Sequence, residues 1–206
     1  GLYFTPDGHS LVHGGHDDKE LSIWDLRTAK RTVGLGRTGG VRCSAISPDG
    51  SRLCVAAADG LGMYRFPCSS GEEPLWNAVP GTTFCDAAFS RDGAMVGSVR
   101  AETGLVEIRD VETGATLHVI GDFPGCVGEP LGLSFSDELL AIGGRDGKPN
   151  EKQVRLVSLR GFAAPKTLEL PGVVMRVTFD PAGTRLAVAL RDPAGVLIFS
   201  AADGWA

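Results

Sequence analysis

The sequence has no apolar stretch approaching the ~20 residues that a membrane-spanning helix needs. Its first residues, GLYFTPDG, have neither the basic start nor the apolar middle of a signal peptide. Charged residues make up 22% of the chain and the net charge is -5, which gives no basic face for a nucleic acid. We therefore expect a cytoplasmic or nuclear protein with no membrane span and no nucleic-acid partner.

The cysteine pattern lacks the spacing of a zinc site or a disulfide framework. There are five cysteines and no two of them form a C-x-x-C pair. An odd number without such spacing fits reduced thiols in the cytosol or nucleus. We expect them to be small buried apolar side chains. They are Cys43, Cys54, Cys68, Cys85 and Cys126.

Helical periodicity is also missing, because no window keeps a 3.6-residue apolar period over three turns. The chain instead carries 29 glycines and 12 prolines spread between short apolar runs, which indicates many tight turns. With 206 residues, 43% of them hydrophobic, it can form one large all-β domain or two smaller domains.

The chain repeats itself with a regular period. The stretch FTPDGHSLVHGG returns in related form as ISPDGSRLCVAA, FSRDGAMVGSVR, FSDELLAIGG and FDPAGTRLAVAL. The first residues of the five copies are separated by 42, 43, 46 and 44 residues. They are Phe4, Ile46, Phe89, Phe135 and Phe179. Such regularity over a whole chain predicts a repeat architecture.

Each copy has the pattern of four short strands. An apolar run such as VRCSAI leads into a Pro-Asp-Gly-like turn, where a second run, RLCVAAA, begins. A third, alternating run follows, for example LSIWDL or LVEIRDV, and then a shorter, more polar one such as ATLHVIG. The last run suits an outer edge strand. Four strands per unit predict the blades of a propeller, stacked face to face around an axis.

The chain resembles the WD40 repeat family, most closely in FTPDGHSLVHGGHDDKELSIWDLRTAK, where Trp24-Asp25 ends the third strand. The resemblance implies an all-β, WD40-like β-propeller over residues 1–206, with about five four-stranded blades. The last unit stops after its third strand. Because seven blades are common in the family, we expect either a fragment of such a ring or a ring that is open or closed by a partner.

Two features of the family are largely absent. The Trp-Asp pair occurs once, and its counterparts are Tyr64-Arg65, Arg109-Asp110, Val157-Ser158 and Phe199-Ser200. The Gly-His pair that precedes the first strand in the family is missing from every unit. The family's buried network of histidine, turn aspartate and tryptophan therefore cannot form as usual. We expect the blades to be held mainly by apolar packing.

One cluster has the composition of a metal site. His13, His16 and Asp17 lie close in HGGHDD, but a spacing of three along a strand puts the two histidines on opposite faces. The aligned copies read AAAD and GGRD and supply no further ligand. We favour a turn whose aspartate caps its own backbone over a zinc site.

Catalytic groups also lack a suitable arrangement. The adjacent carboxylates are Asp17-Asp18, Glu72-Glu73 and Asp137-Glu138, and they are expected on exposed turns. His118 falls on an outer strand, and GLGRTGG lacks the Lys-Ser/Thr ending of a phosphate loop. A propeller enzyme would draw its axis-facing catalytic residues from several blades, and no such set of histidines and acids recurs at equivalent positions in the five units. We predict no enzyme activity, no metal and no cofactor.

The expected function is a protein-protein interaction scaffold, one module of a larger intracellular protein or complex. By analogy with the family, the loops between second and third strands and between blades share one rim, on which other proteins dock. The loop RDGKPNEKQ is longer than its counterparts and densely charged. The predicted rim residues are His16, Asp17, Asp18, Arg37, Asp59, Glu102, Asp122, Glu129, Arg145, Asp146, Lys148, Arg191 and Asp192. The alternatives are a regulatory or sensor propeller fused to an enzyme outside this segment and, less favoured, a propeller enzyme.

Overall fold

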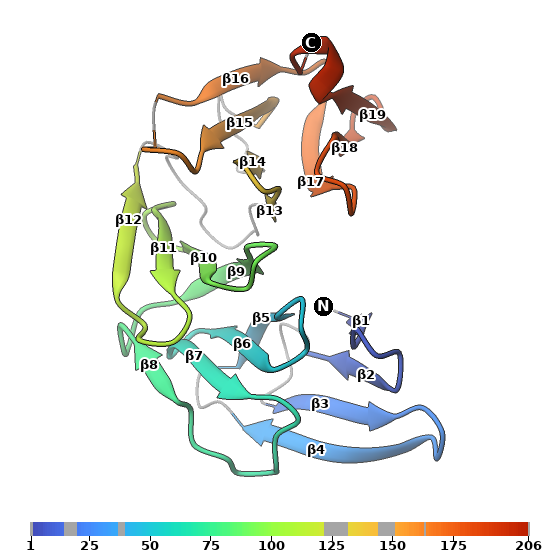
Figure 1. The fold of residues 1–206 in the computed structure, drawn as a ribbon, viewed down its shortest axis with the longest axis vertical. Helices are drawn as coiled ribbons and strands as arrows, with labels where there is room; N and C mark the ends of the chain where they lie inside the picture. The colour runs from blue at the N-terminus through green and yellow to red at the C-terminus, as the bar shows by residue number, and fades with distance from the viewer. Residues whose placement is uncertain are drawn as a thin grey trace.

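The computed structural model describes residues 2–14, 20–36, 40–121, 132–143, 151–162 and 164–205. Within these ranges the chain forms nineteen β-strands in five separate antiparallel sheets, which follow one another along an arc (Figure 1). Each sheet is built from consecutive strands. The all-β propeller prediction is confirmed, and each sheet is one blade.

The first three blades have four strands each. Blade 1 contains β1 (Leu2–Phe4), β2 (Ser10–His13), β3 (Glu20–Asp25) and β4 (Lys30–Gly36). Blade 2 contains β5 (Val41–Ile46), β6 (Arg52–Ala57), β7 (Gly60–Arg65) and β8 (Trp76–Ala78). Blade 3 contains β9 (Phe84–Phe89), β10 (Met95–Arg100), β11 (Val106–Asp110) and β12 (Thr116–Ile120).

The last two blades differ in strand number. Blade 4 contains β13 (Gly132–Phe135), β14 (Leu139–Gly143), β15 (Gln153–Ser158) and β16 (Lys166–Glu169). Blade 5 has three strands in the described residues: β17 (Val173–Phe179), β18 (Arg185–Arg191) and β19 (Gly195–Ser200). This agrees with the prediction that the last unit lacks its fourth strand. A short 3-10 helix, η1 (Ala201–Asp203), follows β19 and is an addition to the predicted strands.

Strand register confirms the repeat alignment made from the sequence. In blade 1, Phe4 pairs with Leu11, which pairs in turn with Trp24. The same three-residue rows in the other blades carry the repeat anchors and the counterparts of the tryptophan. They are Ile46–Leu53–Tyr64, Phe89–Val96–Arg109, Phe135–Leu140–Val157 and Phe179–Leu186–Phe199. Equivalent positions in the repeat therefore occupy equivalent places in the sheets.

The core consists of four apolar clusters, and each one spans the junction between two successive blades. Between blades 2 and 3, for example, fully buried Leu61 and Met63 belong to the same cluster as Phe84 and Val96. Burying side chains of this size contributes roughly 1.5–3 kcal/mol each. The expectation that apolar packing joins the blades is confirmed, although polar bridges accompany it.

The two end blades each expose one apolar face. Val196 and Ile198 of β19 are 65% and 68% exposed. Their register equivalents in the other four blades are all buried, at 3% exposure or less: Leu21, Ile23, Leu61, Met63, Val106, Ile108, Val154 and Leu156. On the opposite face of blade 1, Leu2 and Phe4 are 65% and 64% exposed. Within the described residues, these two faces lie at the ends of the arc (Figure 1).

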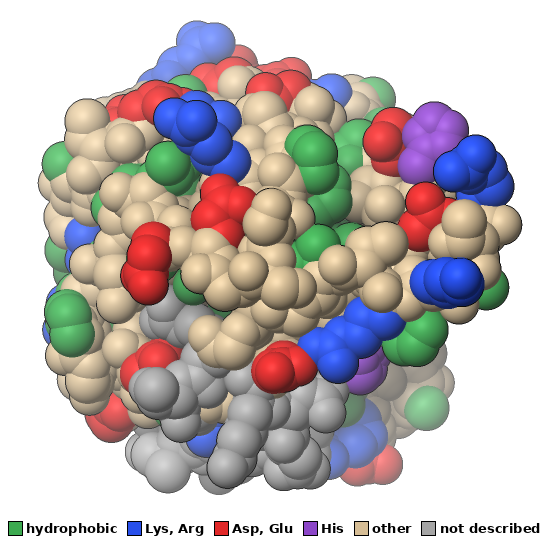
Figure 2. Space-filling view, turned by 90° about the horizontal axis from the view of Figure 1, so that it is seen from below, with side chains coloured by type: hydrophobic (Ala, Val, Ile, Leu, Met, Phe, Trp, Pro, Cys, Tyr) green, Lys and Arg blue, Asp and Glu red, His purple; other side chains and the backbone are tan. Residues whose placement is uncertain are grey.

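The surface is otherwise mixed in character. On the side shown in Figure 2, basic and acidic side chains are interspersed with small apolar patches. Interspersed charges of both signs are usual for the surface of a small domain with a modest net charge, here -5.

Candidate interaction surfaces

The turn after each innermost strand is closed by its own side chains. In blade 2 the Ser47 hydroxyl donates to the Asp49 carboxylate, which also accepts from the Ser51 amide at 3.0 Å. Gly50 has φ +71°, a left-handed conformation that glycine adopts without strain. Donation by Ser47 is the main reason that the pKa of Asp49 falls to about 2. Asp7 and Asp92 accept equivalent bonds, whereas in blade 5 Asp180 takes the position of Ser47 and accepts from the Arg185 amide at 2.9 Å. The prediction of tight Asp-Gly turns is confirmed.

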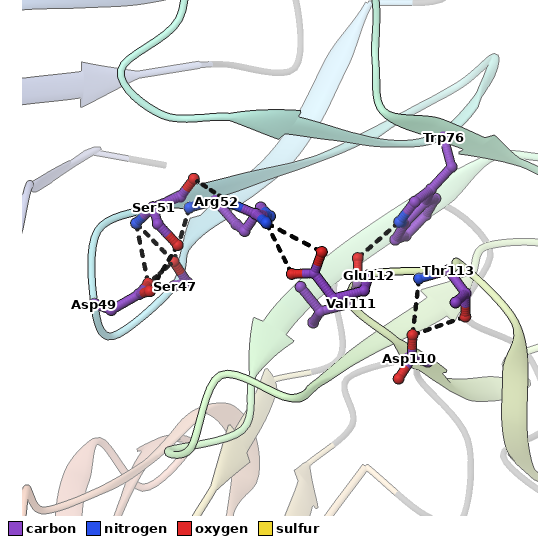
Figure 3. Close-up of polar contacts among 9 residues, drawn as sticks. All are labelled: Ser47, Asp49, Ser51, Arg52, Trp76, Asp110, Val111, Glu112 and Thr113. Atoms are coloured by element: carbon purple, nitrogen blue, oxygen red, sulfur yellow. Dashed lines mark hydrogen bonds and ion pairs between the residues drawn. The ribbon is translucent and has the colours of Figure 1, made fainter.

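These turns carry polar contacts between blades 2 and 3 (Figure 3). Arg52, at the start of β6, donates to both oxygens of Glu112 in blade 3, at 2.8 and 3.1 Å. Trp76 of β8 donates from its indole nitrogen to the Val111 carbonyl at 2.8 Å. A shallow cavity of about 260 Å³ lies between the two turns. The charges of Arg52 and Glu112 are already paired with each other. We therefore interpret this surface as a polar contact that holds blades 2 and 3 together.

A second set of polar contacts joins the blades around the axis. Innermost strands of neighbouring blades are bridged by a side-chain hydrogen bond at every junction between described blades. Tyr3 donates to Ser44 at 3.0 Å, and Cys43 donates from its thiol to Asp86 at 3.1 Å. The Leu133 amide donates to Asp86 at 3.0 Å, and the Phe179 amide donates to the Ser134 hydroxyl at 2.9 Å. These bridges are polar contacts that accompany the apolar packing of the blade junctions.

Asp86 is the centre of this set, because its carboxylate contacts blades on both sides. It accepts from Cys43 of blade 2 and Leu133 of blade 4, and also from the Ala87 amide of its own strand. Desolvation raises the pKa of Asp86 to about 6, against the opposing effect of these donors and of the Arg176 charge. Desolvation and the nearby carboxylate also raise the pKa of the Cys43 thiol, which keeps it protonated as a donor.

The side chains that surround Asp86 are aimed by β-bulges. Register shifts occur next to Arg42 in β5, Cys85 in β9 and Met175 in β17, near the start of each innermost strand. An extra residue in one strand breaks the alternation of side chains and redirects its neighbours. Cys43, Asp86 and Arg176 each follow a bulge directly, and Gly132 takes the same place in β13.

These residues line a cavity of about 420 Å³ at the axis. The lining comes from the innermost strands of all five blades: Leu2, Tyr3, Arg42, Cys43, Ser44, Cys85, Asp86, Gly132, Met175 and Arg176. A hollow of this size falls within the ~300–1,000 Å³ that is usual for ligand sites. It lies at the end where the innermost strands begin, beside the predicted rim. We call it the axial cavity.

Four of the predicted rim residues lie in the described part of the chain. Asp59 and Glu102 occupy turns between the second and third strands, and Glu102 accepts from the Thr83 amide at 3.4 Å. Arg191 ends β18 and lies 3.4 Å from the Asp192 carboxylate. None of the four lines the axial cavity. The other predicted rim residues lie outside the described residues: His16, Asp17, Asp18, Arg37, Asp122, Glu129, Arg145, Asp146 and Lys148.

Backbone hydrogen bonds hold the described rim loops together. The Ala58 amide donates to the Gly40 carbonyl at 3.3 Å, and Gly81 donates to Asp59 at 3.2 Å. In the next blade Ala101 donates to Thr83 at 2.8 Å. Each bond joins a turn between the second and third strands to a loop between blades. The two kinds of loop therefore share one rim, as predicted.

The remaining candidates from the sequence are distributed over the molecule. His13 lies on β2 opposite Ser22, while His16 and Asp17 are outside the described residues. Asp137 and Glu138 each contact a different arginine, at 2.9 Å. No group of His, Cys, Asp and Glu able to hold a metal ion lies in the described ranges.

Three of the cysteines, Cys54, Cys68 and Cys85, are buried, as expected. The interpretation of Cys43 as an apolar side chain was wrong, because its thiol is a hydrogen-bond donor to Asp86. Cys126 lies outside the described residues. His118 lies on outer strand β12 and stacks on Phe162 of blade 4, with ring centroids 4.0 Å apart. Within the described part of the chain, no helix has the length and apolar character needed to cross a membrane.

Comparison with known proteins agrees with the repeat. The family model described as WD domain, G-beta repeat matches residues 30–61, from β4 through the start of β7. WD repeat-containing protein 1-B of Xenopus laevis is 27% identical over 207 residues, which cover 97% of this chain and 32% of that protein. WD repeat and SOCS box-containing protein 1 of Danio rerio is 41% identical over 59 residues, 28% of this chain and 14% of that protein.

A solved structure extends the likeness to the fold. A chain of hydrazine synthase from Kuenenia stuttgartiensis superposes with a TM-score of 0.80 and 15% identity, over 98% of this chain and 63% of that chain. At this identity the likeness concerns the fold alone. The chain thus spans less than two thirds of the proteins that it matches.

Five sheets of consecutive strands, stacked through apolar junctions around an axial cavity, define a β-propeller segment. The repeat spacing, the matching family model over residues 30–61 and the WD-repeat relatives make this segment similar to the WD40 repeat family.

Proposed function

We propose that this propeller segment is a non-catalytic protein-interaction platform, one module of a larger intracellular protein of the cytoplasm or nucleus. The observation that carries the proposal is the fixed geometry of the described rim, where turns and inter-blade loops are hydrogen-bonded to each other. A surface that is ordered before binding loses little conformational entropy when a partner docks. Partner proteins would contact the rim loops and the mouth of the axial cavity.

A second candidate function concerns the rest of the polypeptide, because this segment covers only 32% of WD repeat-containing protein 1-B and 63% of the hydrazine synthase chain. A regulatory or sensor propeller joined to a catalytic domain elsewhere in the polypeptide would have the same blades. The sequence of the whole polypeptide separates the two functions, since a catalytic domain in it would favour the second.

The platform function is tested by comparing partners captured by the wild-type chain with those captured by rim variants. Suitable changes are Glu102→Lys and Asp192→Lys, since both residues lie on the described rim outside the apolar clusters. The control is Arg27→Glu, which reverses an exposed charge in the turn between β3 and β4, at the opposite end of the blades. Quantitative mass spectrometry should show the same proteins lost from both rim variants and retained by the control. Identical capture by all the variants would count against the platform.

A further inference from the structure

The axial cavity holds a carboxylate whose charged form is disfavoured. Asp86 is half-buried and contacts blades 2 and 4, and desolvation of its carboxylate raises the pKa to about 6. The equivalent positions in the neighbouring blades hold Cys43, Gly132 and Arg176. A carboxylate is therefore not needed to build the repeat at this position. Groups held at such a cost in stability are concentrated at functional sites.

The remaining charges around the cavity are positive. Arg42 and Arg176 line it from β5 and β17, and Arg176 is exposed. The other titratable groups that face it are Tyr3, Cys43 and Cys85, from β1, β5 and β9. Burial raises the pKa of Tyr3, and desolvation raises that of Cys43, so both are neutral near pH 7. Two guanidinium groups thus face one carboxylate.

We propose that the axial cavity binds the carboxylate of an acidic side chain from a partner protein, with the exposed guanidinium of Arg176 as its counter-charge. This rests on the proposed function and names the chemistry of the partner. Guanidinium groups pair with carboxylates through paired N–H donors, which favours an acidic group over an apolar one. The cavity volume of about 420 Å³ leaves room for such a side chain.

Binding is coupled to the protonation of Asp86. A second carboxylate brought next to Asp86 disfavours its charged form, so the complex takes up a proton. Since the free pKa of Asp86 is about 6, affinity is higher below this pH and falls as the pH rises through it. The decrease reaches at most ~10-fold per pH unit for a single coupled proton.

The probe is a fluorescent hexaglutamate peptide, measured by anisotropy against the full 206-residue chain at pH 5.5 and 7.5, with hexalysine as the opposite charge. We expect hexaglutamate to bind about 10-fold more tightly at the lower pH. Asp86→Asn should remove this pH dependence and keep the tighter binding at both pH values. Arg176→Ala should weaken binding at least ~10-fold, as loss of a charged hydrogen bond does.

The matched control is Arg160→Ala, which removes an exposed arginine remote from the axial cavity and should leave binding unchanged. Circular dichroism checks the fold of each variant. Preference for hexalysine, or hexaglutamate binding that Arg176→Ala does not weaken, would overturn the proposal. So would an affinity that is equal at the two pH values. Each of these three outcomes is distinct from failure of the platform function, which is tested by comparing the partner proteins captured by the Glu102→Lys and Asp192→Lys variants.

Discussion

The thiol of Cys43 donates a hydrogen bond to the carboxylate of Asp86 across the junction of two blades, at 3.1 Å. The two residues occupy equivalent places in successive repeats, directly after a β-bulge in each innermost strand. These two equivalent positions thus carry complementary side chains, a hydrogen-bond donor in blade 2 and an acceptor in blade 3. This gives the junction of the two blades a specific polar contact at the axis.

The stability of the fold should depend on pH through Asp86. Its pKa is raised from 3.8 in the unfolded chain to about 6 in the folded one, so the folded state binds the proton more tightly. The associated stability is present at low pH and is lost as the pH rises through about 6. Urea unfolding should show Asp86→Asn to be more stable than wild type at pH 7.5, by roughly 1–3 kcal/mol. At pH 5 about half of the difference should remain, and it should disappear below about pH 3.8, where Asp86 is protonated in both the unfolded and the folded chain.

Asp49 provides the opposite dependence as a control. Its pKa is lowered to about 2 by the Ser47 hydroxyl, so its contribution is present near neutral pH and is lost as the pH falls below about 4. Asp49→Asn should therefore lower stability at pH 7.5. If Asp86→Asn also lowered stability at pH 7.5, this would contradict the conclusion that desolvation raises the pKa of Asp86.

Equivalent isoleucines should differ in their importance for folding. Ile108 of blade 3 is fully buried, whereas Ile198, at the same repeat position in blade 5, is 68% exposed. Ile108→Ala should reduce the free energy of unfolding by about 2–5 kcal/mol through lost contacts and a cavity. Ile198→Ala should change it by less than about 0.5 kcal/mol. Chemical denaturation of the two variants measures the difference, and equal losses would show that the face of blade 5 is covered in solution.

Gly114 should tolerate substitution less well than Gly8. Both have a left-handed φ, at +71° and +70°. A Cβ at Gly114 would lie 2.8 Å from the Trp76 ring, while one at Gly8 would meet no atom within 4 Å. Gly114→Ala should therefore cost roughly 1–3 kcal/mol more than Gly8→Ala, since overpacking is added to a shared backbone strain. Thermal unfolding of the pair isolates the steric contribution, and similar melting temperatures would contradict it.

The histidines of blade 1 should not bind a metal ion stoichiometrically. His13 is the last residue of β2, and the described part of the chain contains no group of His, Cys, Asp and Glu around it that could hold a metal ion. Elemental analysis of purified protein should give the same substoichiometric zinc for wild type, His13→Ala and His16→Ala. One zinc per chain that disappears in both variants would restore the metal interpretation of HGGHDD.

The repeat and its strands could be read from the sequence because they depend on local patterns. Aspartate and glycine at the turn near Asp49 and Gly50 specify a hairpin through contacts within five residues. Alternating apolar runs then specify strands, and their spacing specifies blades. The incomplete fifth blade was predicted in the same way, by counting strands after Phe179.

The axial site was not predicted, although a signal for it exists. Asp86 is a charged residue inside the apolar run FCDAAF, on a strand expected to be innermost. A carboxylate in that place needs a partner or a function. A single acidic residue within a strand has neither the loop position nor the metal-ligand spacing on which the predicted sites were based. The bulges at Arg42, Cys85 and Met175 could not be expected, because they follow from the pairing of each strand with its neighbour.

By itself, the sequence determined an all-β chain of five repeats and its tight turns, because both follow from local periodicity and turn chemistry. The tertiary structure alone decided that Tyr3, Cys43, Asp86 and Arg176 meet at one cavity. These residues lie about one repeat or more apart in the chain. Their contact depends on the stacking of whole blades and on the local bulges that turn each side chain toward the axis.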